Sequence, residues 1–261
     1  MNKHVGTDGT VGKALDLLDI VVGFGRPVRF SELVDESPYP KATVHRFLQT
    51  LTNQGMLYYA EDRHTYAPGL RLARLAHHAW QTATLAPLAR PFIEALSHEI
   101  SETVHLAQME AGLVVFIDKV RPAEGFQTLA QPGRLAPAHC TGVGKAMIAY
   151  LDPKHREEVI DAQTFERFTP ATLSKETDLR AELDLIAKSG IAYDRQEHEQ
   201  GITSIAAPIF GAGDKVIGAL SIVTSTMRAA SEDLDRFSPA LLRTAKQIGR
   251  EASVHPYPVA H

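Results

Sequence analysis

The apolar residues in the first 55 positions recur every three or four residues, which is the spacing of an amphipathic helix. The strongest such segment covers 38–55, and its apolar face holds Val44, Phe47, Leu48 and Leu51. Pro38 suits the first turn of a helix because its missing N–H has no partner there, and Gly55 suits a left-handed stop. We therefore predict a helix over this segment.

Two further helices are predicted before it. Thr10 is expected to cap a helix that ends at Gly23, and Ser31 is expected to cap a short helix over 31–36. The order of helix, short helix, tight turn and helix is that of a helix-turn-helix, whose last helix enters a DNA major groove.

The polar face of segment 38–55 carries side chains suited to DNA. It holds Lys41, Thr43, His45, Arg46, Gln49 and Thr50. Such side chains reach phosphates and base edges in a major groove, so we interpret the segment as a recognition helix. An ordinary amphipathic helix with a solvated polar face is the alternative interpretation, and the neighbouring segments argue against it.

After Gly55 the apolar residues alternate, which is the period of a strand. Residues 57–60 and 65–67 predict a hairpin, the wing of a winged helix, with Arg63 at its tip. We place Arg63 where it contacts a phosphate or enters a minor groove, and a solvated turn arginine is the alternative.

Helical spacing returns over 70–81, after Pro68-Gly69 ends the wing. The apolar face of this predicted linker helix needs a partner. A second copy of the chain is the expected partner, because a helix-turn-helix that reads a palindrome binds as a dimer.

From residue 87 onward, helices and strands predict an α+β domain, an antiparallel sheet with helices on its faces. The predicted helices cover 87–100, 142–151, a short segment from Asp152-Pro153, 174–188 with Ser174 as cap and Gly190 as stop, and 231–251. The predicted strands cover 102–110, 113–120, 126–131, 191–194, 202–210 and 216–223, with turns at Ala111-Gly112, Pro132-Gly133 and 211–214.

Composition is that of a globular protein of one large or two smaller domains, with 261 residues, 44% hydrophobic and 22% charged. A net charge of −4 argues against a protein that coats nucleic acid indiscriminately. Within 39–75 the basic residues outnumber the acidic ones, as a local DNA-binding patch requires. We see no membrane span and no signal peptide, and the single Cys140 fits a reducing cytoplasm.

No catalytic constellation is apparent, so we do not expect an enzyme, a cofactor or a metal. Ser204 and Ser221 lie within apolar strands rather than in a GxSxG elbow, and Gly144-Lys145 lacks the spacing of a phosphate loop. HExxH and CxxC patterns do not occur. A zinc site assembled through space stays an open alternative, with candidate ligands His105, His198 and Asp194.

The pattern favours a binding site without chemistry. Residues 141–145 open a helix with several free N–H groups, which suit a carboxylate, while Lys145 itself is expected to point outward. Ser204 and Ser221 each place a hydroxyl in an apolar strand, where it needs a partner, and a nearby backbone carbonyl is the alternative to a ligand. Together with Asp194 they predict a pocket with convergent polar groups.

Four stretches resemble the IclR family of bacterial transcription factors, and this resemblance covers nearly the whole chain. They are PKATVHRFLQTL at 40–51, YAPGLRL at 66–72, HCTGVGKA at 139–146, and YDRQEHE at 193–199 with GITSIAAPI at 201–209. The resemblance implies an α+β protein of two domains. These are an N-terminal winged helix-turn-helix over 1–69 and a GAF-like effector domain over 83–261, joined by a linker helix over 70–82.

The resemblance also implies a function. A homodimer, often paired into a tetramer, binds double-stranded operator DNA and represses or activates a catabolic operon. Effectors are typically small organic acids, aliphatic or aromatic. Its effector pocket falls on Gly142, Val143, Asp194, Ser204 and Ser221, next to Thr141. Val223 stands at a pocket position that is usually polar, so this pocket is expected to be more apolar. Ser204 replaces a frequent cysteine, and Ala42 replaces a frequent serine that contacts phosphate.

Two other functions stay open. One is an enzyme that acts on a small organic acid, with the N-terminal half as an accessory. The other is a DNA-binding protein whose second domain only oligomerises.

Overall fold

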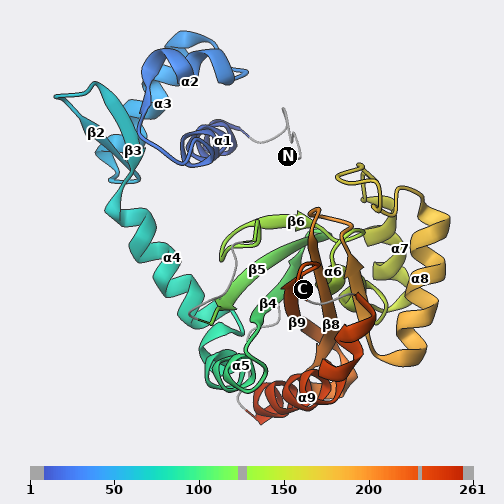
Figure 1. Ribbon diagram of the computed structural model, residues 1–261. Helices are drawn as coiled ribbons and strands as arrows, with labels where there is room; N and C mark the ends of the chain where they lie inside the picture. The colour runs from blue at the N-terminus through green and yellow to red at the C-terminus, as the bar shows by residue number, and fades with distance from the viewer. Residues whose placement is uncertain (1–8, 123–127, 229–230, 255–261) are drawn as a thin grey trace. The chain divides into compact units, whose positions relative to one another are not determined.

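The computed structural model describes residues 9–122, 128–228 and 231–254 of the chain, and of 231 and 232 only the backbone (Figure 1). It contains two compact units, and the division between them falls between Ala79 and Trp80. This division lies inside helix α4 (Leu70–Ala83), which corresponds to the predicted linker helix. Each unit is described by itself below.

The first unit is a winged helix-turn-helix. Its elements are α1 (Thr10–Gly23), β1 (Val28–Arg29), α2 (Phe30–Glu36), α3 (Lys41–Asn53), β2 (Leu57–Ala60) and β3 (Thr65–Pro68). The predicted apolar face of α3 is buried, and it packs with Leu17, Val21 and Leu33 from the other two helices. The helical periodicity therefore identified the core of this unit correctly.

Three predicted helix starts in this unit are wrong by a few residues. The helix predicted from Pro38 begins at Lys41, with Pro40 at the N-cap. Thr10 is the first residue of α1 and caps nothing, because Gly9 holds the cap position. At α2 the cap position belongs to Arg29 rather than Ser31, and the Arg29 N–H donates to the Glu32 carboxylate at 2.9 Å.

The wing is a three-stranded antiparallel sheet in the order β1-β3-β2. The sequence analysis missed β1, which is only two residues long and is defined by its pairing with β3. A glycine is required at position 69, because a Cβ there would lie 2.2 Å from the Gly55 carbonyl oxygen. Gly55 itself has φ +69°, which confirms the predicted left-handed stop after α3.

The second unit is built on a six-stranded antiparallel sheet in the order β6-β5-β4-β9-β8-β7. Its strands are β4 (Thr103–Glu110), β5 (Leu113–Val120), β6 (Leu135–Pro137), β7 (Ala192–Arg195), β8 (Ile202–Phe210) and β9 (Val216–Ser225). Its helices are α5 (Ala86–Ile100), α6 (Gly142–Ile148), α7 (Pro153–Asp161), α8 (Glu176–Ser189) and α9 (Ser238–Val254), with 3-10 turns η1 (Ala212–Asp214) and η2 (Ser231–Phe237).

Helices cover both faces of this sheet (Figure 1). Helices α5 and α9 pack on one face, and α6, α7 and α8 pack on the other. Successive residues of a strand point to opposite faces of the sheet. On β8, Ala207 packs in the core with α5 and α9, and Ala206 packs in the core with α6, α7 and α8; Leu220 and Ala219 on β9 divide in the same way. The predicted two-domain α+β fold is confirmed, while the exact domain boundaries stay predictions.

Four predictions for this unit need correction. Residues 128–131 form no strand, and 126–127 lie outside the described residues; the strand paired with β5 is β6 instead. The predicted closing helix is divided at Ser238 into η2 and α9. Helix α8 begins at Glu176, with Lys175 rather than Ser174 at its N-cap, and α6 ends at Ile148.

No described helix combines the length and apolar character that crossing a bilayer requires.

Candidate functional site

Helix α3 presents its predicted DNA-facing side chains to solvent. Lys41, His45, Arg46 and Gln49 are exposed, and Thr43 is half-buried. In the described part of the chain, no carboxylate lies within ion-pair distance of Lys41 or Arg46. Their charges are therefore available to a phosphate backbone.

Two aromatic residues that the sequence analysis did not single out position this surface. The Phe30 ring stands edge-on to the His45 ring, with centroids 6.0 Å apart, and lies 5.9 Å from the Lys41 ammonium. The Tyr39 hydroxyl donates to Asp16 on α1, which fastens the turn before α3 to the first helix.

Arg63 lies at the tip of the wing, where its side chain is 74% exposed. Its Nε lies 3.2 Å from the carboxylate of Asp62, an exposed pair that contributes little to stability and is readily exchanged for a phosphate. The structure therefore places Arg63 at the tip of the wing with a weak competing partner, while its contact with DNA stays a prediction.

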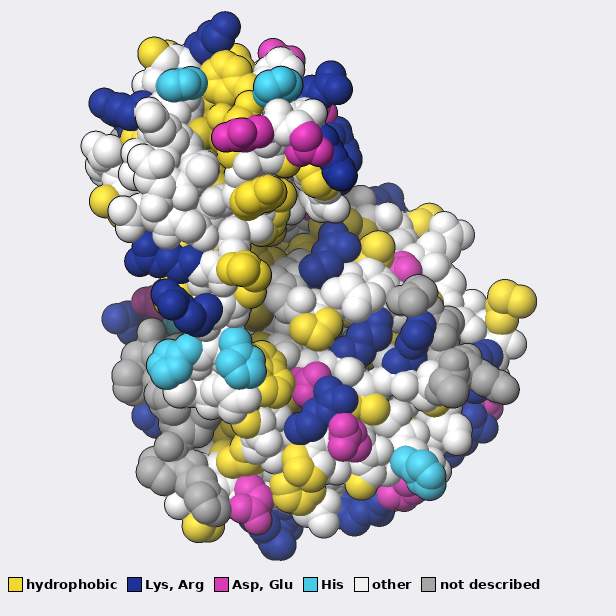
Figure 2. All heavy atoms as spheres, turned by 90° about the vertical axis from the view of Figure 1, so that its left-hand side faces the viewer, with side chains coloured by type: hydrophobic (Ala, Val, Ile, Leu, Met, Phe, Trp, Pro, Cys, Tyr) yellow, Lys and Arg dark blue, Asp and Glu magenta, His cyan; other side chains and the backbone are white. Residues whose placement is uncertain are grey.

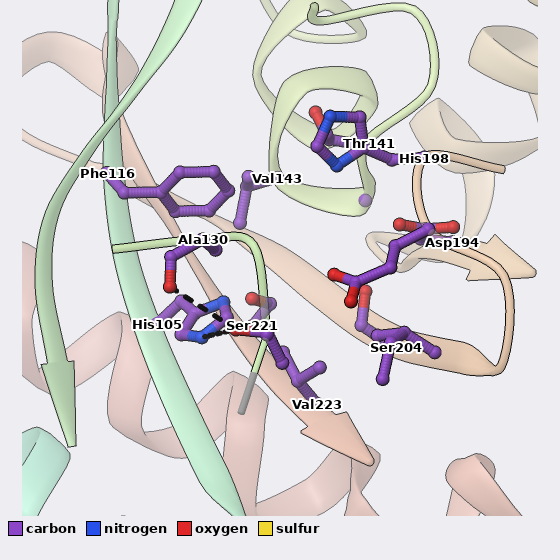
Figure 3. Close-up of a pocket in the computed structure, with 14 residues that line it drawn as sticks. His105, Phe116, Ala130, Thr141, Val143, Asp194, His198, Ser204, Ser221 and Val223 are labelled. Carbon is purple, nitrogen blue, oxygen red and sulfur yellow. Dashed lines mark hydrogen bonds between the residues drawn. The ribbon is translucent and has the colours of Figure 1, made fainter. Parts of the chain in front are cut away.

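The second unit contains a small cavity between the start of α6 and strands β4, β5, β7, β8 and β9 (Figure 3). All six predicted effector residues line it: Thr141, Gly142, Val143, Asp194, Ser204 and Ser221. Val223 lines it as well, with Phe116, Ala130 and Ile202, so apolar side chains lie among the polar ones. Its volume is about 30 Å³, which is room for about two water molecules.

Strand register brings the polar lining residues together. Asp194 on β7 lies opposite Ser204 on β8, and Ser221 on β9 lies opposite His105 on β4. Helix α6 approaches them closely because residue 142 is a glycine, where a Cβ would lie 3.1 Å from the Ser204 hydroxyl oxygen. Residues distant in the sequence thus meet in one place.

The start of α6 offers fewer free donors than the sequence predicted. The Thr141 hydroxyl accepts from the Gly144 N–H at 3.3 Å and donates to the Pro137 carbonyl at 3.0 Å. The Lys145 N–H is also taken, by the Thr141 carbonyl at 3.0 Å. Thr141 is therefore a helix cap at the cavity wall.

The expectation that Lys145 points outward is wrong. Its side chain is 0% exposed, and its ammonium lies 2.6 and 2.7 Å from the two carboxylate oxygens of Glu197. The Glu182 carboxylate is 3.5 Å away. Every residue of α6 is buried, so this lysine has no route to solvent.

Asp194 is buried, and its environment disfavours its charged form. Burial and the nearby Glu197 carboxylate raise the pKa of Asp194 to about 7. One carboxyl oxygen, Oδ1, accepts from the Glu197 N–H at 2.7 Å. A carboxyl group that changes protonation near neutral pH therefore faces the cavity.

Two histidines also line the cavity. Burial, with Lys119 nearby, lowers the pKa of His105 to about 3, and burial with Arg134 nearby lowers the pKa of His198. Both rings are neutral at physiological pH. Within the described ranges, no three His, Cys, Asp or Glu side chains lie close enough to share a metal ion, so the zinc set considered above is not assembled.

A short irregular segment, 128–130, closes one side of the cavity. The Lys119 ammonium donates to the Thr128 hydroxyl at 2.9 Å and to the Ala130 carbonyl at 3.0 Å. The Leu129 N–H donates to the Glu199 carboxylate at 2.8 Å. Side chains, rather than strand pairing, hold this wall in place.

Comparison with known proteins identifies both units. The model of the IclR helix-turn-helix domain matches residues 10–61, and that of the bacterial transcriptional regulator IclR C-terminal domain matches residues 77–250. The chain belongs to the IclR family. It is a transcriptional regulator with a helix-turn-helix DNA-binding domain and an IclR-type effector domain.

Relatives match this IclR-family chain over most of their length. The regulator KdgR of Dickeya chrysanthemi is 29% identical over 95% of this chain and 82% of its own. The transcriptional repressor IclR of Escherichia coli is 26% identical over 90% of this chain and 87% of its own. A solved IclR homologue from Microbacterium hydrocarbonoxydans, complexed with 4-hydroxybenzoate, has a TM-score of 0.79 at 24% identity and covers 93% of this chain and 98% of its own.

The sequence analysis predicted the lining residues on strands β7, β8 and β9 and at the start of α6, but it missed the rest of the cavity wall. His105 and His198 were considered only as metal ligands, and Lys119 and Glu199 were not considered. Lys119 offered one signal, because it and Asp118 are the charged residues of an otherwise apolar strand. Its partners lie in an irregular segment, which no periodicity marks.

Proposed function

We propose that this IclR-family regulator controls a catabolic operon, and that a small organic acid bound in the cavity of the second unit controls the regulator. One observation carries the proposal. The six residues predicted for the effector site come from separate parts of the chain, and all six line one cavity. Convergent polar groups in an apolar enclosure are typical of small-molecule sites.

The chemistry of the wall and one relative support an organic acid. Phe116, Val143 and Val223 suit an apolar body, while Ser204 and Ser221 offer hydroxyls to a polar end. The homologue from M. hydrocarbonoxydans is complexed with 4-hydroxybenzoate, an acid of this kind. Because the cavity holds only about 30 Å³, part of its wall moves when such an acid enters.

The DNA-binding role belongs to α3 and the wing. Exposed Lys41, His45, Arg46 and Gln49, with Thr43, contact the major groove, and Arg63 contacts the backbone or the adjacent minor groove. The free charges of Lys41 and Arg46 supply the electrostatic part of the affinity.

The protein acts as a homodimer, with a dimer of dimers as a further assembly, in the cytoplasm. Helix α4 supports this, because none of its residues is buried. Leu70 is 89% and Leu75 is 47% exposed, and hydrophobic side chains lie at the surface among basic and histidine side chains over α4 (Figure 2). Dimers place two recognition helices about 34 Å apart, one turn of DNA, or a multiple of that.

The effector acts by binding one arrangement of the dimer more tightly than another. Its affinity difference sets how far the DNA-binding equilibrium shifts, for repression or for activation. The linkage is reciprocal, so operator DNA changes effector affinity by the same factor.

The test starts with selection of binding sites from random duplex DNA by the full-length protein. Fluorescence anisotropy then measures operator affinity with and without each acid of a panel that includes 4-hydroxybenzoate, benzoate and aliphatic monocarboxylates. We expect one class of acids to change operator affinity. Thermal unfolding measures binding independently, since a ligand at 100 times its Kd adds about 2.7 kcal/mol of stability.

Other outcomes favour the alternatives. If no acid stabilises the protein, the second unit only oligomerises. If a bound acid is consumed on prolonged incubation, the protein is an enzyme. Failure of the selection to enrich any palindromic site contradicts the DNA-binding role.

A further inference from the structure

The charges around the effector cavity conflict with a simple acid-binding site. The described residues that line it include two carboxyl side chains, Asp194 and Glu199, and no lysine or arginine. A ligand carboxylate placed there meets like charge in a poorly solvated enclosure, which is strongly unfavourable. The Ser204 and Ser221 hydroxyls can donate to the acid but leave both carboxyl charges in place, so binding is more favourable when one of these charges is removed.

The nearby basic groups do not neutralise either carboxyl of the cavity. The Lys145 ammonium is held by both carboxylate oxygens of Glu197, at 2.6 and 2.7 Å. The Lys119 ammonium is bonded to the wall, at Thr128 and Ala130. His105 is buried and uncharged at neutral pH, because burial keeps its pKa low.

Asp194 has the geometry of a protonated donor. Its carboxyl group accepts from the Glu197 N–H, at 2.7 Å to Oδ1, and also from the His198 N–H. A carboxyl group that accepts both bonds still has room for a proton, because each of its oxygens has two lone pairs. Asp194 is buried, and it lies beside the Thr141 cap and the Ser204 hydroxyl. The carboxylate of Glu197, which does not line the cavity, is also nearby. Two carboxylates that cannot both be solvated hold a proton more tightly.

The titratable and charged groups around Asp194 come from every element packed there. They are Cys140 and Lys145 at α6, Glu197, His198 and Glu199 in the turn after β7, Glu182 on α8, His105 on β4, Lys119 on β5, and Arg134 before β6. His139, which directly precedes Cys140, belongs to the same set. Each lysine has an oxygen partner, Arg134 donates to the Leu129 carbonyl at 3.5 Å, and burial lowers the pKa of all three histidines. Asp194 is the group left to change charge when an anion enters.

We propose that protonated Asp194 recognises the effector's carboxylate, so that the cavity takes up the acid anion together with one proton. This inference rests on the proposed function. The Asp194 O–H donates to a ligand carboxylate oxygen and forms a short, charge-assisted hydrogen bond. The proton comes from solvent and balances the charge of the ligand anion. No covalent bond forms or breaks apart from this O–H bond.

The proposal restricts the class of effector. A monocarboxylate binds best where Asp194 already holds its proton. A neutral ligand that donates a hydroxyl or amide N–H to Asp194 binds the ionised form better, and its affinity changes with pH in the opposite direction.

The test is isothermal titration of the full-length protein with benzoate and 4-hydroxybenzoate from about pH 6 to about pH 8. Titrations in buffers of different ionisation heat count the protons taken up. We expect affinity to fall towards tenfold per pH unit above neutrality, with uptake rising towards one proton per acid bound. Benzamide, the neutral counterpart, shows no such fall.

The matched variant is Asp194→Asn. Asparagine keeps an oxygen for the Glu197 N–H and presents a permanent N–H donor to the cavity. We expect it to bind both acids with pH-independent affinity, close to that of the wild type at the lowest pH, and without proton uptake. Glu199→Gln removes the other carboxyl of the cavity and is expected to keep the wild-type slope.

The outcomes separate this inference from the function on which it rests. If neither of these acids nor any other acid of the panel binds at any pH, the proposed function fails and the inference fails with it. If an acid binds above neutral pH without proton uptake, the acid-binding function stands and the role of Asp194 is wrong. Proton uptake in the wild-type protein tests the inference even if Asp194→Asn fails to fold.

Discussion

The Lys145 ammonium donates to both carboxylate oxygens of Glu197, at 2.6 and 2.7 Å, although their side chains are only 0% and 5% exposed. This ion pair joins helix α6, which begins at the cavity, to the turn that follows Asp194. The Thr172 hydroxyl holds the same turn, through the Glu197 carbonyl at 2.6 Å. The pair therefore fixes the position of α6 relative to the turn that carries Asp194 to the cavity wall.

Lys145→Met is expected to destabilise the second unit by about 3–5 kcal/mol, because it leaves the Glu197 carboxylate buried without a cation. Urea unfolding followed by the fluorescence of Trp80 measures this, since the single tryptophan is hydrogen-bonded to Ile117 inside that unit. The control is Arg180→Met, which breaks the exposed pairs with Glu157 and Glu176 and is expected to cost about 1 kcal/mol. Equal losses in both variants contradict the role assigned to the buried pair.

Asp194→Asn is expected to change how stability depends on pH. The folded state raises the pKa of Asp194 to about 7 from 3.8, so between these values the folded protein keeps a proton that the unfolded chain has lost. Wild-type stability therefore falls as pH rises through this window, by up to about 1.4 kcal/mol per unit. The asparagine variant lacks this fall.

The measurement is urea unfolding of both proteins at about pH 5 and about pH 7. The stability of the variant relative to the wild type is expected to increase with pH. A constant difference shows that the Asp194 carboxyl titrates normally in the folded protein.

Periodicity was sufficient to predict most elements of this fold, because burial on one face produces it directly. The apolar face of α3 and the strands β4, β5 and β8 follow from that rule. It failed for the two-residue strand β1, which exists only through pairing with β3. It also failed for residues 128–131 of the strand predicted at 126–131, because which segment pairs with the edge of β5 is decided by tertiary contacts.

The candidate site shows the same division. The residue pattern and the family resemblance together located six lining residues, although their role in binding stays a prediction. Lys145 was misjudged because a lysine in a helix usually reaches solvent. Only the packing of α6 between the sheet and neighbouring helices buries every residue of that helix. The wall formed by 128–130 was missed, since its contacts with Lys119 and Glu199 leave no periodic pattern.

Arg46→Ala is expected to weaken operator binding by about 1–3 kcal/mol if its contact is to a base. A contact to phosphate alone weakens binding to all sequences alike and lowers the salt slope by about one. Fluorescence anisotropy on the selected operator and on a scrambled duplex, at several salt concentrations, distinguishes the two cases. Lys154→Ala removes an exposed charge of the second unit and is the control for net charge. Wild-type affinity in Arg46→Ala shows that the recognition face is misassigned.

Lys119→Met is expected to loosen the cavity wall, because it removes the hydrogen bonds to Thr128 and Ala130. Hydrogen bonds to a charged group contribute about 1.5–3 kcal/mol each, so amide exchange in 128–135 rises measurably without any ligand. The Leu129 N–H is the most informative amide, since Glu199 remains its acceptor in this variant. If 128–130 is the part of the wall that moves, benzoate enters and leaves faster in Lys119→Met, while Lys154→Met behaves as the wild type. Unchanged exchange together with unchanged entry rates shows that the acid enters elsewhere.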